Sequence, residues 1–285
     1  MVTRTPHVSL VIEQLSPHMG AAVSGIDLKT ASDATRVDLN VALHANLVLC
    51  ICGQTLQPSA FRDAMTTFGQ PVERRQITQH PECAEVNIIS SDDRDIHGDG
   101  KRLVNGANWH TDDSFMREPC ALTMLYGVIV PSSGGDTQFA NMYRAYEDLD
   151  ADVRGRIDRL KVVHRYHSSR KGAKAGKRPA DEMAAMPDAE HPLVRTHPVT
   201  GRRALYMNPN RMDQVAGLSR SDSDALLDML ITHATDARYQ YRHKWRQGDI
   251  IIWDNRCTMH KANADYADGE RRLMHRVVVA GTVPV

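Results

Sequence analysis

The chain has 285 residues, 41% of them hydrophobic and 25% charged, which is typical of a globular protein with a sizeable core. Lys plus Arg and Asp plus Glu number 35 each, so no basic excess points to nucleic acid as a partner. We find no apolar run long enough for a membrane span or a secretory signal, and five cysteines without regular spacing predict a reducing, cytoplasmic location without disulfides.

The first half of the chain combines apolar runs with two helical patterns. In chain order we expect short strands within 8–28, a helix over 30–46, a strand over 47–52, a helix over 58–69, irregular chain over 71–85, and strands over 85–90, 121–130 and 136–142. Cys50 and Cys52 lie in the run 47–52, where we expect buried thiols that pack as small apolar side chains rather than a metal site.

In the second half we expect helices over 142–149 and 151–162, two short strands around 198–201, a helix over 219–234, and strands over 239–245, 249–253 and 271–280. Residues 165–191 lack periodicity, which is typical of a lid or a solvated insertion. Many strands and few helices indicate a single domain over 1–285 that is mainly β with α additions, built as a β-sandwich or jelly roll.

Two separated fragments carry the clearest chemistry. His110 and Asp112 are two residues apart, so on an extended strand both side chains point to one face. A second histidine, His260, follows the apolar strand that ends at Trp253. Two imidazoles and one carboxylate form the facial triad of non-heme Fe(II) oxygenases. An oxygen-activating enzyme is therefore the leading hypothesis.

The strand over 271–280 carries two arginines on one face. Arg272 and Arg276 are four residues apart, roughly 13 Å along a strand. Buried guanidinium groups are costly unless each one meets an anion, so the strand predicts a pocket for two separate acidic ligands. Thr137, which follows the Gly134-Gly135 turn, offers a hydroxyl donor that can share an anion with an arginine.

Taken together, these fragments resemble the taurine/phenoxyacetate-herbicide dioxygenase family, whose members depend on Fe(II) and 2-oxoglutarate. The resemblance extends from Gly20 to Gly281, and the order of the motifs makes it specific. The motifs are Asn108-Trp109-His110-Thr111-Asp112, Ser133-Gly134-Gly135-Asp136-Thr137, Val194-Arg195-Thr196-His197-Pro198, Trp253-Asp254-Asn255-Arg256 with His260, and Asn263-Ala264-Asp265-Tyr266 with Arg271-Arg272-Leu273-Met274-His275-Arg276.

The resemblance implies a double-stranded β-helix (jelly-roll) core flanked by helices. It makes His110, Asp112 and His260 the catalytic metal ligands and assigns Thr137 and Arg272 to the distal carboxylate of 2-oxoglutarate. O2 and 2-oxoglutarate would be consumed, with release of succinate and CO2, as a small anionic substrate is hydroxylated. That substrate would be an alkylsulfonate, an aryloxyalkanoate or a related carboxylate. Relatives commonly form homodimers or homotetramers.

The departures from the family pattern concern the substrate. The resemblance places Arg276 at its acidic group, and we add Arg74, Asp113 and Phe115 as substrate-binding candidates. Arg74 lies in Val72-Glu73-Arg74-Arg75, where taurine enzymes carry a histidine-rich stretch. Asp113 replaces a small or apolar residue; because it follows Asp112 on the expected strand, we expect its side chain to point outward.

Two other functional classes fit parts of the pattern. A jelly-roll zinc hydrolase would use the same two histidines and the carboxylate, but it leaves Arg272 without a partner. A non-catalytic metal-binding module predicts no turnover with any metal. Neither a zinc hydrolase nor a non-catalytic module would need all four of His110, Asp112, His260 and Arg272, so their joint presence favours the oxygenase.

Overall fold

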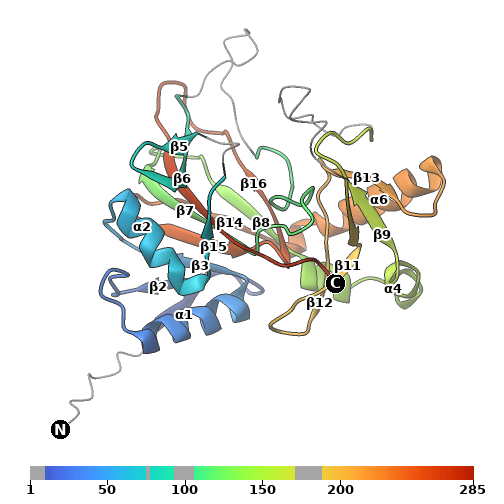
Figure 1. Ribbon diagram of the computed structural model, residues 1–285, viewed down its shortest axis with the longest axis horizontal. Coiled ribbons are helices and arrows are strands. Elements are labelled where there is room, and N and C mark those ends of the chain that lie inside the picture. The colour runs from blue at the N-terminus through green and yellow to red at the C-terminus, as the bar shows by residue number, and fades with distance from the viewer. Residues whose placement is uncertain (1–9, 75–77, 93–105, 171–187) are drawn as a thin grey trace.

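Two β-sheets stack at the centre of the computed structural model (Figure 1), which describes residues 10–74, 78–92, 106–170 and 188–285. The larger sheet has the order β1 (Val11–Gln14), β2 (Ala21–Ser24), β3 (Val48–Ile51), β15 (Ile250–Asp254), β7 (Leu122–Ile129), β17 (Leu273–Val279), β6 (Cys83–Ser90) and β5 (Gln79–His80), with β4 (Pro71–Val72) also paired to β17. The smaller sheet has the order β14 (Gln240–His243), β8 (Thr137–Asn141) and β16 (Thr258–Ala262).

The central strands of the larger sheet are buried on both faces, and β15 shows why. Ile250 and Ile252 point to one apolar cluster, whereas Ile251 and Trp253 point to the other. Successive strand side chains alternate between faces, so a strand covered on both sides needs an unbroken apolar run. The run at 250–253 therefore forms the strand expected from the sequence.

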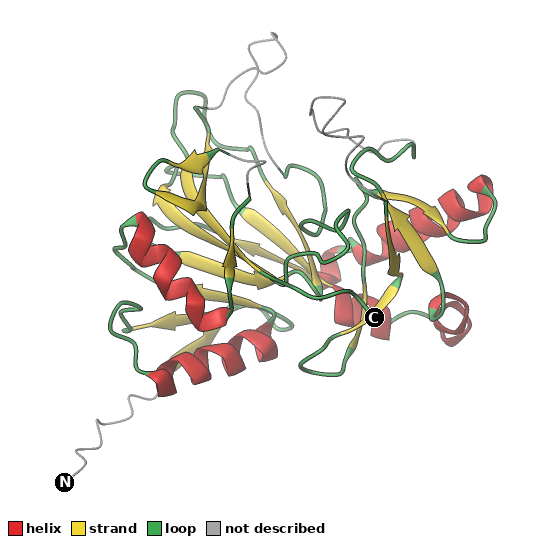
Figure 2. Cartoon of the chain, in the orientation of Figure 1, coloured by secondary structure: helices red, strands yellow, loops and turns green. Residues whose placement is uncertain are grey.

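Helices α1 (Asp33–Asn46) and α2 (Pro58–Met65) lie along the outer face of the larger sheet (Figure 2). Ser32 caps α1 by accepting a hydrogen bond from the Thr35 amide, and Pro58 opens α2 at a position where no amide donor is needed. A short 3-10 helix, η1 (Thr66–Phe68), ends at Gly69. Apolar side chains of both helices form the outer cluster with Ile250 and Ile252.

A second group of elements packs beside the smaller sheet. It contains the sheet of β10 (Ala189–Pro192), β9 (Lys161–His164) and β13 (Met212–Val215), the hairpin of β11 (Val194–Thr196) and β12 (Arg203–Leu205), and the helices α3 (Met142–Glu147), α4 (Ala151–Ile157), α6 (Arg220–Ala234) and η2 (Ala237–Tyr239). Ser219 caps α6 through the Asp222 amide. Their apolar side chains join the inner cluster that fills the space between the two sheets.

The structure corrects three sequence expectations. The helix expected over 151–162 ends at Ile157, because Lys161–His164 form β9 between β10 and β13. The segment 71–85 is not irregular, since it contains β4, β5 and the start of β6. Within 165–191, Ala189 to His191 belong to β10, and 171–187 lie outside the described residues.

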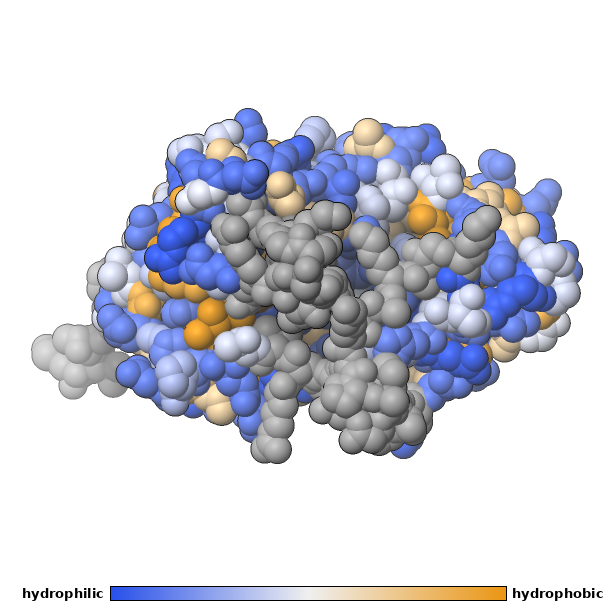
Figure 3. Space-filling model, turned by 90° about the horizontal axis from the view of Figure 1, so that it is seen from above, coloured by the Kyte–Doolittle hydropathy of each residue, from blue (hydrophilic) through white to orange (hydrophobic). Residues whose placement is uncertain are grey.

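The visible surface is mostly polar. In the view from above, hydrophilic residues dominate the coloured part of the molecule and apolar residues appear in scattered areas (Figure 3). Among the described residues, no helix has the length and apolar character needed to cross a membrane.

The two-sided burial of β15 yields a stability prediction. Ile252 is 0% exposed, whereas Ile12 on β1 is 44% exposed. We expect Ile252→Ala to lower the free energy of unfolding by about 2–5 kcal/mol because it removes buried methyl groups and leaves a cavity. The matched change Ile12→Ala should cost about 0.5 kcal/mol or less. Urea denaturation measures both, and equal costs would contradict the two-sided packing.

Candidate active site

The three residues expected to bind a metal come together at one end of the inner cluster. His110 and His260 form an antiparallel bridge, in which each backbone amide donates to the other residue's carbonyl at 3.0 and 2.8 Å. Asp112 faces the Nε2 atoms of both rings: its Oδ1 is 3.7 Å from His110 Nε2, and its Oδ2 is 3.8 Å from His260 Nε2. One ligand atom from each residue lies within 4.8 Å of the others.

The two imidazoles are held so that Nε2 faces the carboxylate. His110 Nδ1 lies 2.8 Å from the Asn108 carbonyl, so Nδ1 carries the proton and Nε2 keeps its lone pair. The His260 ring packs 4.6 Å from the Trp253 ring. Burial lowers the pKa of His260 well below its ordinary value, and the neighbouring His110 adds to this effect, so the His260 ring is neutral near pH 7.

Asp112 is ionised and fixed in place by two donors. Thr123 on β7 donates its hydroxyl to Asp112 Oδ2 at 2.6 Å, and Arg276 Nη2 on β17 lies 3.1 Å from the same oxygen. Burial alone would raise the pKa of Asp112, but the Arg276 guanidinium, together with the hydrogen bond from Thr123, outweighs it and keeps that pKa below its usual range. The carboxylate therefore presents a negative charge to the histidines.

Asn255 supports this arrangement and was not identified from the sequence as a site residue. Its side-chain amide donates to Thr123 Oγ1 at 2.8 Å, and its Oδ1 accepts from the Asp112 amide at 3.3 Å and from Trp253 Nε1 at 3.1 Å. Asn255 thus connects β15 to both the aspartate and its hydroxyl donor. The position of Asn255 in the motif with Trp253 could have identified it as a site residue. Thr123 gave no such indication, because a single threonine in an apolar strand is common.

Arg272 is a buried cation with an unfilled hydrogen-bonding position. Its Nε donates to the Gly135 carbonyl at 3.1 Å, and its Nη2 has no hydrogen-bond partner. Burial lowers the pKa of Arg272 to about 10, so the group stays charged at neutral pH. Within the described parts of the chain, no carboxylate forms an ion pair with it. A buried guanidinium in this state calls for an anion.

Thr137 lies near this guanidinium through Trp245. Trp245 Nε1 donates to Thr137 Oγ1 at 3.0 Å, and the Arg272 guanidinium carbon lies 5.9 Å from the Trp245 ring centroid. Gly135 has a φ of +70°, and a Cβ added there would lie 2.9 Å from Pro131 Cγ and 3.3 Å from Arg272 Cδ. Only glycine therefore allows this turn to pass so close to the guanidinium.

The three further substrate-binding candidates lie close to this centre or next to it in the chain. The expectation that Asp113 points outward is wrong: the chain turns after His110, Asp113 adopts a φ of +55°, and its Oδ2 accepts a hydrogen bond from Arg74 Nε at 2.8 Å. The positive charge of Arg74 therefore balances Asp113. Phe115 is half-buried, with its ring 5.0 Å from that of Tyr166.

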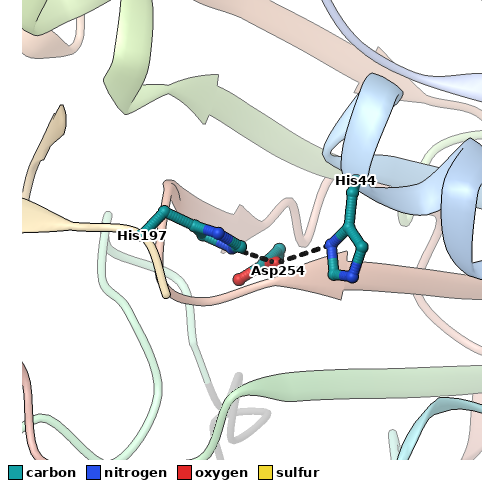
Figure 4. Close-up of side chains that lie close together, drawn as sticks. All are labelled: His44, His197 and Asp254. Atoms are coloured by element: carbon teal, nitrogen blue, oxygen red, sulfur yellow. Dashed lines mark hydrogen bonds and ion pairs between the residues drawn. The ribbon is translucent and has the colours of Figure 1, made fainter. Parts of the chain in front are cut away.

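A second group of potential ligands joins α1 to β15. His44, His197 and Asp254 also lie within metal-binding distance of one another (Figure 4). However, Asp254 already forms a two-pronged ion pair with Arg256, at 2.8 and 2.6 Å. His197 Nδ1 accepts two backbone amides, so Nε2 must carry the proton that it donates to Asp254 at 2.9 Å. This leaves no lone pair on His197 for a metal. The group acts as a buried polar network.

A third group consists of Cys50, Cys52 and Asp249. It has no part in the geometry around Asp112, because these residues lie at the other end of β3 and β15 from Asp254, beside the edge strand β14.

Comparisons with known proteins identify the family of this chain. The family model described as "Taurine catabolism dioxygenase TauD, TfdA family" matches residues 12–278. The alpha-ketoglutarate-dependent 2,4-dichlorophenoxyacetate dioxygenase of Cupriavidus pinatubonensis is 34% identical over 94% of this chain and 97% of its own length. The alpha-ketoglutarate-dependent sulfate ester dioxygenase of Pseudomonas putida is 32% identical, with 98% and 93% covered.

Solved structures of related proteins superpose closely on this chain. A crystal structure from Burkholderia xenovorans, described as a putative alpha-ketoglutarate-dependent taurine dioxygenase, superposes with a TM-score of 0.83 and 32% identity over 97% of this chain and 94% of that one. AAD-2, solved in complex with Mn(II) and N-oxalylglycine, superposes with a TM-score of 0.81 and 30% identity over 97% and 99%.

The chain therefore belongs to the TauD/TfdA family. It is an alpha-ketoglutarate-dependent (2-oxoglutarate-dependent) dioxygenase.

The Asp254 network yields a stability prediction. Asp254→Asn should lower the free energy of unfolding by about 3–5 kcal/mol because it leaves the buried Arg256 without a counter-charge. Asp152→Asn, at an exposed position of α4, should change it by about 0.5 kcal/mol or less. Denaturation of metal-free protein measures both, and a mild effect of Asp254→Asn would contradict a structural role for the network.

Proposed function

We propose that His110, Asp112 and His260 bind the Fe(II) of this dioxygenase. Their donors fit a ferrous ion because they are two neutral imidazole nitrogens and one carboxylate, the set that leaves further positions open for co-substrate and oxygen. The hydrogen bond from His110 Nδ1 to the Asn108 carbonyl is the orienting contact that metal-bound histidines usually make. This set supports iron better than the His44 group, because His197 in that group has no lone pair free for a metal.

We propose that Arg272 and Thr137 bind the distal carboxylate of 2-oxoglutarate. The unpartnered Arg272 Nη2 supplies the donor, and the carboxylate supplies the missing negative charge. N-oxalylglycine, present in the AAD-2 structure, differs from 2-oxoglutarate only by an N–H in place of a methylene group. A related chain thus accommodates a molecule of this shape and charge.

When bound, Fe(II) and 2-oxoglutarate supply the oxidising power: one O2 is consumed, the keto acid becomes succinate and CO2, and one substrate C–H becomes C–OH. The protein's own groups position the reactants. Asp112 is kept ionised by Arg276, His110 is kept in one tautomer by Asn108, and His260 is kept neutral by burial. Family membership favours this chemistry over a zinc hydrolase or a non-catalytic metal-binding module.

The charges at the site favour a substrate with one negative charge. Asp112 with Arg276 and Asp113 with Arg74 form two ion pairs and cancel, which leaves the positive charge of Arg272. A ferrous ion adds two positive charges and 2-oxoglutarate adds two negative charges. One positive charge then remains, and a monoanionic substrate neutralises it.

We propose that this substrate is a small organic acid, an alkylsulfonate, an aryloxyalkanoate or a related carboxylate, whose acidic group binds Arg276. The similar proteins named for 2,4-dichlorophenoxyacetate and for sulfate esters act on anions of this kind. Arg276 meets Asp112 through Nη2, and a guanidinium has further donors that could bind a second acid. Phe115 is suited to the apolar part of the substrate, and the Arg74–Asp113 pair to a polar edge.

We further propose a single domain with a jelly-roll core, which the two stacked sheets support. Three expectations remain predictions: that residues 165–191 form a lid, that the chain forms a homodimer or homotetramer, and that the protein is cytoplasmic. All five cysteines are free thiols, which suits a reducing compartment.

The metal assignment predicts that Asp112→Ala abolishes succinate release from 2-oxoglutarate in the presence of Fe(II), with or without substrate, because the site loses its only anionic ligand. His44→Ala is the matched control, since it removes a member of the other histidine pair. It should retain turnover. Loss of activity in His44→Ala together with an active Asp112→Ala would contradict the assignment.

The co-substrate assignment predicts that Arg272→Met weakens 2-oxoglutarate binding by roughly 10- to 150-fold, equivalent to about 1.5–3 kcal/mol for hydrogen bonds to a charged group. Arg271→Met changes the adjacent exposed arginine, which pairs with Asp92, and should leave binding unchanged. Calorimetric titration with Mn(II) present measures both. Equal affinities in wild type and Arg272→Met would contradict the assignment.

A screen of sulfonates, sulfate esters and aryloxyalkanoates for substrate-dependent succinate release identifies the substrate class. Neutral analogues of each compound are the controls. Equal stimulation by the neutral analogues would refute the role of the charge.

A further inference from the structure

Two cysteines and a carboxylate meet at the edge of the larger sheet, away from Asp112. Cys50 on β3 and Cys52 just beyond it are two residues apart, and their sulfur atoms are 3.6 Å apart. That separation is close to the sulfur–sulfur edge of a zinc tetrahedron, about 3.8 Å for Zn–S bonds of about 2.3 Å. Ligand atoms of both thiols and of Asp249 lie within 4.8 Å of one another. Cys50 is buried, and Cys52 is partly exposed, so the group can be reached from solvent.

Asp249 is a buried carboxylate that lacks a strong cation. It is 3% exposed, and its Oδ2 accepts a hydrogen bond from the Arg246 backbone amide at 3.1 Å. Within the described residues, no lysine or arginine side chain forms an ion pair with it. Burial of a carboxylate is costly unless positive charge lies close by. The surroundings therefore favour a cation between Asp249 and the thiols.

His243, the last residue of β14, lies beside Asp249 and is a further potential donor, although it is not one of the three residues whose ligand atoms all lie within 4.8 Å. It is 5% exposed, and its Nε2 has no hydrogen-bond partner. That nitrogen lies 3.7 Å from Asp249 Oδ2. Its other nitrogen, Nδ1, lies 2.8 Å from the Tyr241 hydroxyl. If Nδ1 carries the proton and donates a hydrogen bond to this hydroxyl, the lone pair on Nε2 is free. An unpartnered buried nitrogen directed at this carboxylate is a second, independent sign of a missing ligand.

We propose that Cys50, Cys52, Asp249 and His243 form a zinc site separate from the catalytic centre. Thiolates, imidazoles and carboxylates are all zinc ligands, so the Cys50–Cys52–Asp249 group supplies three of them and His243, beside Asp249, would supply the fourth. The sequence alone favoured apolar packing of these thiols, because it does not show that Asp249 and His243 lie beside them. This proposal does not depend on the assignment of iron to His110, Asp112 and His260.

The position of the group suggests what zinc would do there. Cys50 belongs to the larger sheet, whereas His243 ends the edge strand of the smaller sheet. A metal bound by Cys50 and His243 would link the larger sheet to the edge strand of the smaller sheet. Burial raises the pKa of both thiols, although Arg246 opposes this. Zinc must displace their protons, so its affinity should rise with pH.

Cobalt(II) provides the test, because a thiolate–cobalt bond gives an intense near-ultraviolet charge-transfer band that nitrogen and oxygen ligands do not give. The catalytic residues include no sulfur. Titration of the reduced, metal-free full-length protein should therefore develop this band with a stoichiometry of about one cobalt per chain, and zinc should abolish it. Absence of the band at saturating cobalt would overturn the proposal.

Four variants assign the band. Cys52→Ser, at the partly exposed position, and His243→Ala should each lower the affinity at least tenfold, and Cys52→Ser should also weaken the band. Cys83→Ser, which changes a buried thiol outside the group, and Asp112→Ala should retain the full band. A band that survives unchanged in Cys52→Ser would overturn the proposal. Retained succinate release would show that Cys52→Ser is folded.

If Cys52→Ser does not fold, alkylation of the thiols in the wild-type protein tests instead whether zinc binds Cys50 and Cys52. Zinc should protect two thiols per chain, and a chelator should reverse this protection. Unchanged alkylation in the presence of zinc would exclude the site.

Discussion

The backbone bridge between His110 and His260 is the constraint on which the site depends. It joins a segment with little other regular structure to the smaller sheet, with hydrogen bonds of 3.0 and 2.8 Å. The bridge fixes the two rings side by side, with centroids 4.1 Å apart, and places Asp112 opposite them. Backbone hydrogen bonds rather than flexible side chains set this spacing, so His260 is held beside His110 and Asp112 although about 150 residues separate them in the sequence.

Charge balance links this centre to the fold. β7, β15 and β17 lie next to one another in the larger sheet, and one polar side chain on or directly after each of these strands contacts Asp112. Thr123, Asn255 and Arg276 are these side chains. Their burial is tolerated because each donor meets an acceptor. Arg272, four residues before Arg276, is the exception, and its unfilled donor supports the proposal that it binds a carboxylate of 2-oxoglutarate.

The sequence predicted the candidate metal ligands better than it predicted the contacts around them. His110 and His260 were identifiable because metal chemistry restricts which residue types can serve, and because their motifs occur in a specific order. The outward direction of Asp113 was wrongly predicted because strand alternation fails where the chain turns with a positive φ. Asn255 was not recognised as a support because its role depends on neighbours distant in sequence. Lys161–His164 was read as helix because its two partner strands are likewise remote.

The most direct test is a crystal structure of the protein with Mn(II) and 2-oxoglutarate, in which anomalous scattering locates the metal. The proposed ligand set predicts a manganese peak at bonding distance from the Nε2 atoms of His110 and His260 and from an oxygen of Asp112, with a carboxylate of 2-oxoglutarate at Arg272. A peak at His44, His197 and Asp254, or a co-substrate bound away from Arg272, would contradict it.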